Sequence, residues 1–233
     1  MAFRVKILHN KFQALVARMQ TGHAKKAAGA PSNATPEQLA EAYRIGITPR
    51  TSITSPLRIY AINLEFGNAA IGMTICPGKR GESDYGGPWR RDLIVDMEVI
   101  REWDCRILVT VMELGELEAF HVTNLGASAT SAGIQWYHIP ITDGDPPDER
   151  FETLWPEVGP VILNALRGGQ RVVIHCRGGL GRTGMIACLL LIELGWSPQS
   201  SLETVRQKRP GTVETPAQEL YVLNYQPHLS PHE

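Results

Sequence analysis

The chain has 233 residues, 43% of them hydrophobic, which is enough apolar material for the core of one domain with an extension. Its 23 basic and 24 acidic residues leave a net charge of −1, so neither nucleic acid nor an anionic membrane surface is expected as a partner. The four cysteines show neither a Cys-X-X-Cys pair nor a zinc-type spacing, which argues against a disulfide scaffold and against a bound metal.

The apolar segments predict no stable membrane insertion. The longest apolar run, residues 185–192, is too short to cross a bilayer, and no secretory segment stands at the start of the chain. We therefore expect a cytoplasmic protein, in a reducing compartment that keeps a cysteine thiol reactive.

Residues 1–55 differ in composition from the rest of the chain. No Asp or Glu occurs between Met1 and Pro36, whereas six Lys and Arg residues do. Apolar residues at helical spacing predict a short helix over 11–20, residues 27–36 have a linker composition, and Thr35 before Pro36 predicts a second helix start. We interpret residues 1–55 as an N-terminal extension, partly helical or loosely ordered, with an organellar transit peptide as the alternative.

From residue 56 to 226 the pattern is that of one α/β domain, followed by a tail over 227–233. The predicted strands cover residues 58–64, 70–75, 107–111, 134–139 and 172–174. The predicted helices cover residues 89–103, 113–125, 128–133, 151–166, 185–194, 197–208 and 215–225. Strands that alternate with helices predict a central, mostly parallel sheet flanked by helices. The turn-rich segment 76–81 is either a surface connection or a wall of the site.

The stretch from Val172 to Gly184 carries the strongest functional signal. A β-branched run leads into a glycine-rich loop, and an apolar helix follows. Strand, tight loop and helix together direct backbone N–H groups and the positive end of a helix toward an anion. Cys176 opens the loop and Arg182 closes it with five residues between them, so the loop predicts a phosphate site with a sulfur nucleophile at its base.

The residue types in this Cys-X5-Arg loop suggest a role for each position. Cys176 is the predicted nucleophile, because the loop amides, the helix end and the arginines all favour a thiolate. Its neighbourhood distinguishes it from Cys105 and Cys188, which we expect to be buried and inert. The planar fork of Arg182 fits two phosphoryl oxygens and can stabilise the transition state. The remaining positions predicted to bind the substrate are Arg177, Gly178, Gly179, Leu180 and Gly181.

Three further features of the loop concern its neighbours and its backbone. Glycines 178, 179, 181 and 184 permit a positive φ and a close approach of the backbone to the ligand. His175 is expected to form a hydrogen bond behind the loop rather than to act as an acid or base. Thr183 either donates its hydroxyl to the sulfur as it leaves or is an ordinary threonine at a helix start.

The segment from His175 to Thr183 resembles the HCxxGxxR[S/T] signature of the cysteine-based protein tyrosine and dual-specificity phosphatases. The resemblance extends to Cys76-Pro77-Gly78, Arg91-Asp92-Leu93, residues 113–117, residues 138–144 and residues 209–215, which are similar to the kinase-associated (cyclin-dependent-kinase inhibitor type) dual-specificity phosphatases. It covers residues 57–225. It implies a hydrolase acting on phosphotyrosine, and on phosphoserine and phosphothreonine of phosphorylated proteins, through a cysteinyl-phosphate intermediate without a cofactor or metal.

The general acid is sought among three aspartates in the loop 142–148. Asp145 and Asp148 flank prolines just before a helix, so either is equally an N-cap or a first-turn acid. Asp143 ends a predicted strand before a glycine, which suits a residue presented on a loop, and the resemblance also places the acid there. The resemblance further places a water-positioning amide at Gln218, for which a solvent-facing helical glutamine is the alternative reading.

Three other functions remain open at this stage. A phosphatase of inositol phosphates or phosphoinositides can use the same loop, but such enzymes tend to carry extra lysines there, and here Arg177 is the only additional base. A non-catalytic phosphate-binding module would not need Cys176, Arg182 and Asp143 together. An arsenate-reductase or rhodanese-like enzyme would need other loop patterns or resolving cysteines, although Cys76 is a candidate for a reversible protective disulfide.

Overall fold

The central sheet has five strands in the order β1-β2-β7-β5-β6. The strands are β1 (Tyr60–Asn63), β2 (Ala70–Ile75), β5 (Cys105–Thr110), β6 (Gln135–His138) and β7 (Arg171–Cys176). β1 is antiparallel to β2, and the other neighbouring pairs are parallel. β7 lies in the middle, and its Val172, Val173 and Ile174 are fully buried, as expected for a strand covered on both faces. The predicted mostly parallel α/β fold is therefore confirmed.

This computed structural model describes residues 49–83 and 87–229. The helix predicted over 11–20, the linker over 27–36 and the helix start at Thr35 lie outside the described residues. The domain boundaries at 55/56 and 226/227 stay predictions.

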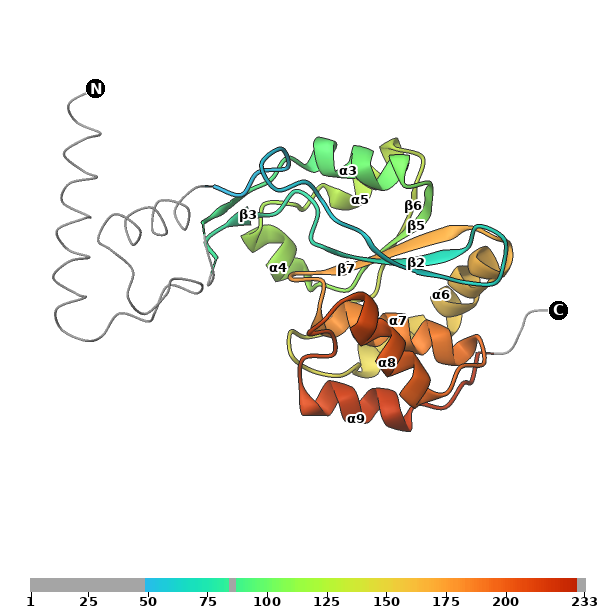
Figure 1. Ribbon diagram of the computed structural model, residues 1–233. Helices are drawn as coiled ribbons and strands as arrows, with labels where there is room; N and C mark the ends of the chain where they lie inside the picture. Colours follow the sequence, from blue (N-terminus) through green and yellow to red (C-terminus); the bar gives the residue numbers. More distant parts are fainter. Residues whose placement is uncertain (1–48, 84–86, 230–233) are drawn as a thin grey trace, which may run out of the picture. The chain divides into compact units, whose positions relative to one another are not determined.

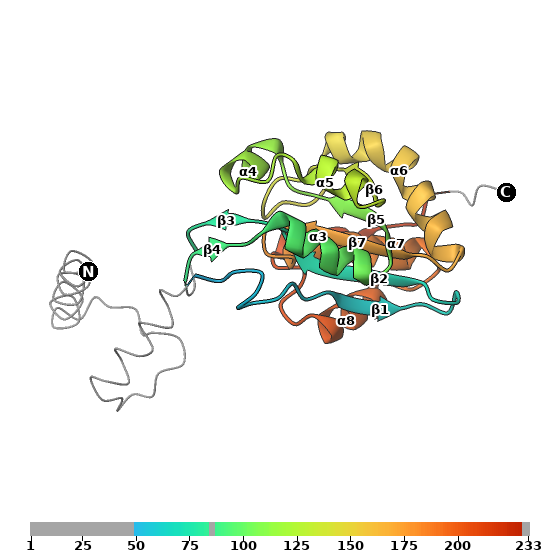
Figure 2. The same cartoon turned by 90° about the horizontal axis from the view of Figure 1, so that it is seen from above.

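Helices cover both faces of the sheet (Figures 1 and 2). On one face lie α3 (Leu93–Glu102), α4 (Leu114–Ala119) and α5 (Leu125–Ser131). On the other lie α6 (Glu149–Arg167), α7 (Gly181–Glu193), α8 (Pro198–Lys208) and α9 (Pro216–Asn224). All 13 residues of α7 are buried, because it is packed between the sheet and the helices α6, α8 and α9. The helix that follows the Cys-X5-Arg loop is thus part of the core, which fixes the loop in place.

Three predicted helices were wrong in extent. The helix predicted over 89–103 begins only at Leu93, because Trp89–Arg90 (β4) pairs with Arg80–Gly81 (β3) and Asp92 caps the helix by accepting hydrogen bonds from the amides of Ile94 and Val95. The helix predicted over 113–125 ends already at Ala119 (α4), since His121 has a left-handed backbone with φ 57°, and the helix predicted over 128–133 is α5, which begins earlier, at Leu125.

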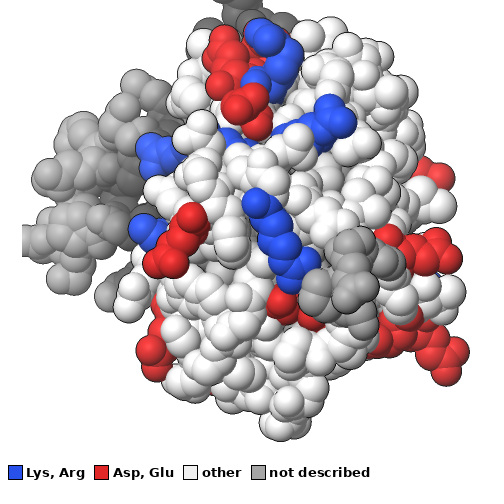
Figure 3. Space-filling view, turned by 90° about the vertical axis from the view of Figure 1, so that its right-hand side faces the viewer, with Lys and Arg blue, Asp and Glu red and all other residues white. Residues whose placement is uncertain are grey.

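The surface away from the loop carries charges of both signs. Figure 3 shows the side of the molecule that lies at the right in Figure 1, where the β1–β2 hairpin turns. On this side Lys and Arg side chains are interspersed with Asp and Glu. Within the described residues, no helix is long and apolar enough to span a membrane.

Candidate active site

The Cys-X5-Arg loop begins where β7 ends. Cys176 is the last residue of the strand and is 3% exposed. The amide of Gly179 donates a hydrogen bond to its Sγ atom at 3.2 Å. The loop backbone therefore curls around the sulfur, and a hydrogen-bond donor is directed at it.

The four glycines of the loop do not share one role. Only Gly179 has a positive φ, at 68°, and a Cβ on it would lie 2.1 Å from the carbonyl oxygen of Thr74. Gly178, Gly181 and Gly184 do not use the positive φ that glycine permits. Close packing explains two of them: a Cβ on Gly181 would meet the Glu214 carboxylate at 2.7 Å, and one on Gly184 would meet Thr212 at 2.7 Å.

Arg182 is buried and held by several acceptors at once. Its Nη1 and Nη2 donate to the two carboxylate oxygens of Glu116 at 2.5 and 2.8 Å. Nη1 also donates to the carbonyl of Ile141 at 3.0 Å, and Nη2 to Oδ1 of Asp143 at 2.8 Å. Burial acts against the charge, but the Glu116 hydrogen bonds and the nearby Cys176, Glu116 and Asp143 charges raise the pKa of Arg182 above its ordinary value. The guanidinium is therefore always charged and fixed in direction.

Asp143 is the aspartate of its loop that reaches the Cys-X5-Arg segment. One carboxylate oxygen accepts from Arg182, and the other lies 3.3 Å from Nη2 of Arg177. Its side chain is 44% exposed, so it borders solvent as well as the loop. β6 ends at His138, so Asp143 lies beyond the strand rather than at its end.

The other two aspartates point elsewhere. Asp148 caps α6 and pairs with Arg150 at 2.6 Å, which draws its carboxylate away from the loop. Asp145 is exposed and contributes its backbone carbonyl to Gln218 at 3.4 Å.

Two cations support the loop from outside. Lys79 donates from Nζ to the carbonyl of Arg177 at 2.9 Å, and Arg209 donates from Nη2 to the carbonyl of Gly178 at 2.7 Å. Lys79 is buried beside the rings of Trp89 and Phe120, and burial lowers its pKa to about 8. The segment 76–81 is thus a wall of the site rather than a simple surface connection.

His175 and Thr183 flank the loop inside the core. His175 is fully buried, and its Nε2 lies 2.7 Å from Oγ1 of Thr110. Burial lowers the pKa of His175 to about 3, so its imidazole is neutral at physiological pH. The hydroxyl of Thr183 is buried without a hydrogen-bond partner among the described residues.

Glu214, just before α9, and Gln218, in the first turn of α9, lie against Gly181. Gln218 is 1% exposed, and its Oε1 accepts from the amide of Glu214 at 3.0 Å. The reading of Gln218 as a solvent-facing residue is wrong. The carboxylate of Glu214 accepts a hydrogen bond from the amide of Gly181 at 2.7 Å.

The remaining cysteines differ from Cys176. Burial raises the pKa of Cys105 and of Cys188 to about 12, as expected for inert core thiols. Burial likewise raises the pKa of Cys76, whose amide contacts the carbonyl of Arg177 at 3.4 Å. All four thiols are free, and a protective disulfide of Cys76 stays a prediction.

Sequence reasoning missed four residues of this site: Glu116, Lys79, Arg209 and Glu214. Each lies in or next to a segment that carries the family resemblance, but none falls within the Cys-X5-Arg loop itself. Their contacts with the loop join residues 31 to 98 positions apart, which local spacing does not reveal.

Comparisons with known proteins agree with this geometry. The family model Tc-R-P, described as polymorphic toxin system, DSP-PTPase phosphatase, matches residues 85–195. Mouse cyclin-dependent kinase inhibitor 3 is 32% identical over 143 residues, which are 60% of this chain and 66% of that protein. Mouse protein tyrosine phosphatase type IVA 2 is 31% identical over 129 residues, 49% of this chain and 72% of that protein. The chain belongs to the cysteine-based protein tyrosine and dual-specificity phosphatases.

A solved structure extends this family assignment to the fold. The chain shares a TM-score of 0.63 and 28% identity with kinase associated phosphatase whose catalytic-site cysteine is replaced by serine. The match covers 72% of this chain and 93% of that one. Against mouse cyclin-dependent kinase inhibitor 3, in contrast, the chain spans only about two thirds of the relative's length.

Proposed function

We propose that the chain removes phosphate from phosphorylated proteins in the cytoplasm, acting on phosphotyrosine and also on phosphoserine and phosphothreonine. The observation that carries the proposal is the position of Arg182. Its guanidinium closes the loop that Cys176 opens and contacts the carboxylate of Asp143 at 2.8 Å, so a nucleophile, a phosphate-binding fork and an acid converge on one small site.

The first step transfers the phosphoryl group to sulfur. The Cys176 thiolate attacks phosphorus while the P–O bond to the substrate side chain breaks, and Asp143 gives its proton to the departing oxygen. Arg182 and the amides of residues 177–181 bind the equatorial oxygens, where negative charge spreads in the transition state. The hydrogen bond from the Gly179 amide to Sγ supports the role of Cys176 as nucleophile, because it stabilises the negative charge of the thiolate.

The second step releases phosphate. Asp143, now a base, takes a proton from a water molecule whose oxygen attacks phosphorus, and the P–S bond breaks. Gln218 positions this water, and its burial against Gly181 supports that role. Thr183 donates its hydroxyl to the departing sulfur, for which its unpartnered Oγ1 is suited. His175 supports the loop from behind as a neutral residue.

The proposal is tested with p-nitrophenyl phosphate and a panel of phosphopeptides. The wild-type chain should hydrolyse both, and Cys176→Ser should abolish turnover because the hydroxyl is a far weaker nucleophile. Unchanged turnover in Cys176→Ser would refute the role of Cys176. Inositol phosphates and phosphoinositides belong in the same panel, and a strong preference for them would overturn the protein substrate. An Asp143→Ala pull-down from a lysate would then capture the phosphoprotein.

A further inference from the structure

The loop that carries Asp143, residues 142–148, is called the acid loop below, and contacts fix it on both sides of Asp143. After Asp143, the hydroxyl of Thr215 donates to the carbonyl of Gly144 at 2.9 Å, which ties this part of the loop to the start of α9. The side chain of Asp143 is 44% exposed, so burial alone does not fix it. Its position therefore also depends on how the loop is held before Asp143.

Arg150, in the first turn of α6, holds the acid loop on that other side. Its Nη2 donates to Oγ1 of Thr142, the residue before the acid, at 2.9 Å. Its Nη1 donates to Oε1 of Glu113 at 2.8 Å, and the Thr142 hydroxyl lies 3.3 Å from the same carboxylate oxygen. Since a hydroxyl has one proton and two lone pairs, Thr142 accepts from Arg150 and donates to Glu113 at the same time. The three side chains thus form a closed triangle of hydrogen bonds.

The guanidinium of Arg150 is itself fixed by the N-cap of its own helix. Nε and Nη2 donate to Oδ2 of Asp148 at 2.9 and 2.6 Å. The hydrogen bonds to Asp148 and Glu113 raise the pKa of Arg150 above its ordinary value, so the group is always charged. Each of its nitrogens has an acceptor, and a planar guanidinium bonded in this way has little freedom to rotate.

The contact with Glu113 also connects Arg150 to the catalytic arginine. The amide of Glu113 donates to Oε2 of Glu116 at 2.9 Å, and the same oxygen accepts from Nη1 of Arg182. Nη2 of Arg182 donates to Oδ1 of Asp143 at 2.8 Å, which leads back to the acid loop. A continuous path of hydrogen bonds therefore leaves Arg150 through α4 and returns at the acid itself.

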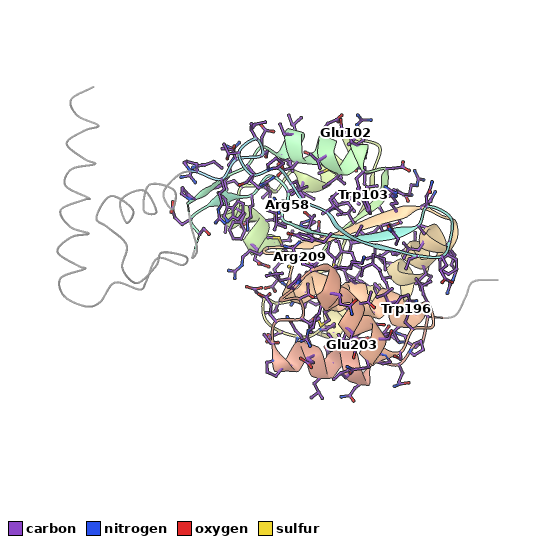
Figure 4. The ribbon with its side chains drawn as sticks, viewed as in Figure 1. Arg58, Glu102, Trp103, Trp196, Glu203 and Arg209 are labelled. Atoms are coloured by element: carbon purple, nitrogen blue, oxygen red, sulfur yellow. The ribbon has the colours of Figure 1, made fainter. Side chains whose placement is uncertain are left out.

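This arrangement differs from that of an ordinary surface charge. Glu203, labelled in Figure 4, is an exposed residue of α8 and accepts a hydrogen bond from Gln199 one turn earlier on the same helix. Arg150 instead joins α6 to α4 and to the acid loop, and its contact with Glu113 bridges 37 positions. The Arg150 side chain is 47% exposed, and ion pairs as exposed as this contribute little to the free energy of unfolding. Its contacts therefore act on where the acid loop lies more than on whether the domain folds.

We propose that Arg150 is a positioning residue for the general acid of the phosphatase reaction. By holding Thr142 it keeps the Asp143 carboxylate beside the Cys-X5-Arg loop, where Asp143 gives its proton to the departing oxygen. This inference rests on the proposed function and deepens it, because it assigns the position of the acid to a residue that contacts the acid loop rather than the reacting atoms. A displacement of about 1 Å can lower the rate about a hundredfold, so even a partial release of the loop is measurable.

The test compares two substrates that differ in how much they need the acid. Phenolate is a stronger base than p-nitrophenolate and leaves less readily, so phenyl phosphate depends more on Asp143 than p-nitrophenyl phosphate does. Arg150→Ala should lower kcat/KM about tenfold with phenyl phosphate and about twofold or less with p-nitrophenyl phosphate. Loss of folded protein would lower both values equally, so their ratio reports positioning. Thr142→Val, which removes the hydroxyl that Arg150 holds, should change the ratio in the same direction.

The control variants separate positioning from a general effect of charge or folding. Arg106→Ala removes an exposed arginine of β5 outside the acid loop and should keep the wild-type ratio. Arg150→Ala keeps the backbone amide that donates to Asp148, so the start of α6 stays capped, and urea denaturation checks this. In a protein that already carries Asp143→Asn, adding Arg150→Ala should cost a further factor of about two or less, because an acid that has been removed cannot be misplaced.

The outcomes separate this inference from the proposed function. A wild-type chain that hydrolyses neither aryl phosphate nor any phosphopeptide would refute the proposed function. With an active wild type, an unchanged ratio of the two kcat/KM values in folded Arg150→Ala would overturn the inference alone. If that variant does not fold, an unchanged ratio in Thr142→Val overturns it instead. A loss from Arg150→Ala that is as large beside Asp143→Asn as in the wild type would overturn it too, as would an equal change of the ratio in Arg106→Ala.

Discussion

Glu116 forms a bidentate salt bridge with Arg182, whose Nη1 and Nη2 donate to the two carboxylate oxygens at 2.5 and 2.8 Å. The same Oε2 atom also accepts from the amide of Glu113 at 2.9 Å, which ties the carboxylate to the first turn of α4. A planar guanidinium held on one edge by two bonds has little freedom to rotate. The direction in which the Arg182 guanidinium faces the loop therefore depends on α4, a short helix on the face of the sheet opposite α7.

Glu116→Gln should weaken catalysis by about 10–100-fold in kcat, because the amide cannot hold both Nη atoms and the fork of Arg182 loses its orientation. KM should change less than kcat, since the charge of Arg182 stays in the loop. Steady-state kinetics with p-nitrophenyl phosphate measure both. Glu118→Gln, on the exposed side of the same helix, should match the wild type. An equal kcat in the wild type, Glu116→Gln and Glu118→Gln would show that Glu116 does not orient Arg182 for catalysis.

Asp143→Asn should lower kcat by about 10²–10⁴-fold for substrates with a poor leaving group, because no proton then reaches the departing oxygen. The loss should be smaller for p-nitrophenyl phosphate, whose phenolate leaves more easily. Comparing phenyl phosphate with p-nitrophenyl phosphate measures this difference. Asp145→Asn is the control two residues further on, and a larger loss there than in Asp143→Asn would assign the acid to Asp145.

Gly179→Ala should reduce both activity and stability. The alanine would need a φ of 68°, and its Cβ would lie 2.1 Å from the carbonyl oxygen of Thr74. The strain of a left-handed backbone alone costs about 1–2 kcal/mol, and the clash adds to it. Urea denaturation and phosphatase assays measure the two effects. Gly178→Ala is the matched control, because it has no positive φ and no atom within 4 Å of its Cβ, so it should keep the wild-type stability.

Glu214→Gln should strengthen inhibition by inorganic phosphate or vanadate. The Glu214 carboxylate occupies the amide of Gly181 and places a negative charge beside the loop, so an incoming anion must compete with it. Removing that charge should lower the inhibition constant about three- to tenfold. Glu219→Gln is a control on α9 that pairs with Arg206 instead. An unchanged inhibition constant in Glu214→Gln would show that the carboxylate does not compete.

His175 should make the folded state sensitive to acid. In the unfolded chain histidine takes up a proton below about pH 6.5, whereas burial lowers the folded pKa to about 3. Between these values the unfolded state binds one more proton, so the free energy of unfolding falls as the pH falls, by at most about 1.4 kcal/mol per pH unit. Urea denaturation between pH 7 and 5 measures this slope.

Replacing His175 tests whether this residue causes the pH dependence of the free energy of unfolding. His175→Gln should flatten it, although the variant is less stable overall at neutral pH. His121→Asn, which changes an exposed histidine whose left-handed backbone suits asparagine, should leave the slope as it is. The same slope in His175→Gln as in the wild type would show that another group causes the acid sensitivity.

The predictions from sequence that succeeded concern contiguous residues. Val172–Ile174, the Cys-X5-Arg loop and the apolar helix behind it form one uninterrupted stretch, and all are found as strand, loop and α7. An error arose where strand pairing competed with helical periodicity. Trp89–Arg90 pairs with Arg80–Gly81, and this pairing shortens a helix whose apolar spacing extends further toward the N-terminus.

The sequence by itself determined the order of Cys176, the glycines and Arg182, since β-branched strand residues, loop glycines and a helix start each act over a few neighbouring positions. Only the tertiary structure decided which distant groups meet the loop. Parallel strands bring their carboxyl ends to one edge of the sheet, and this edge gathers Glu116, Lys79, Asp143 and Arg209 around residues 176–182. Such meetings depend on the register and packing of the whole sheet, which no local pattern encodes.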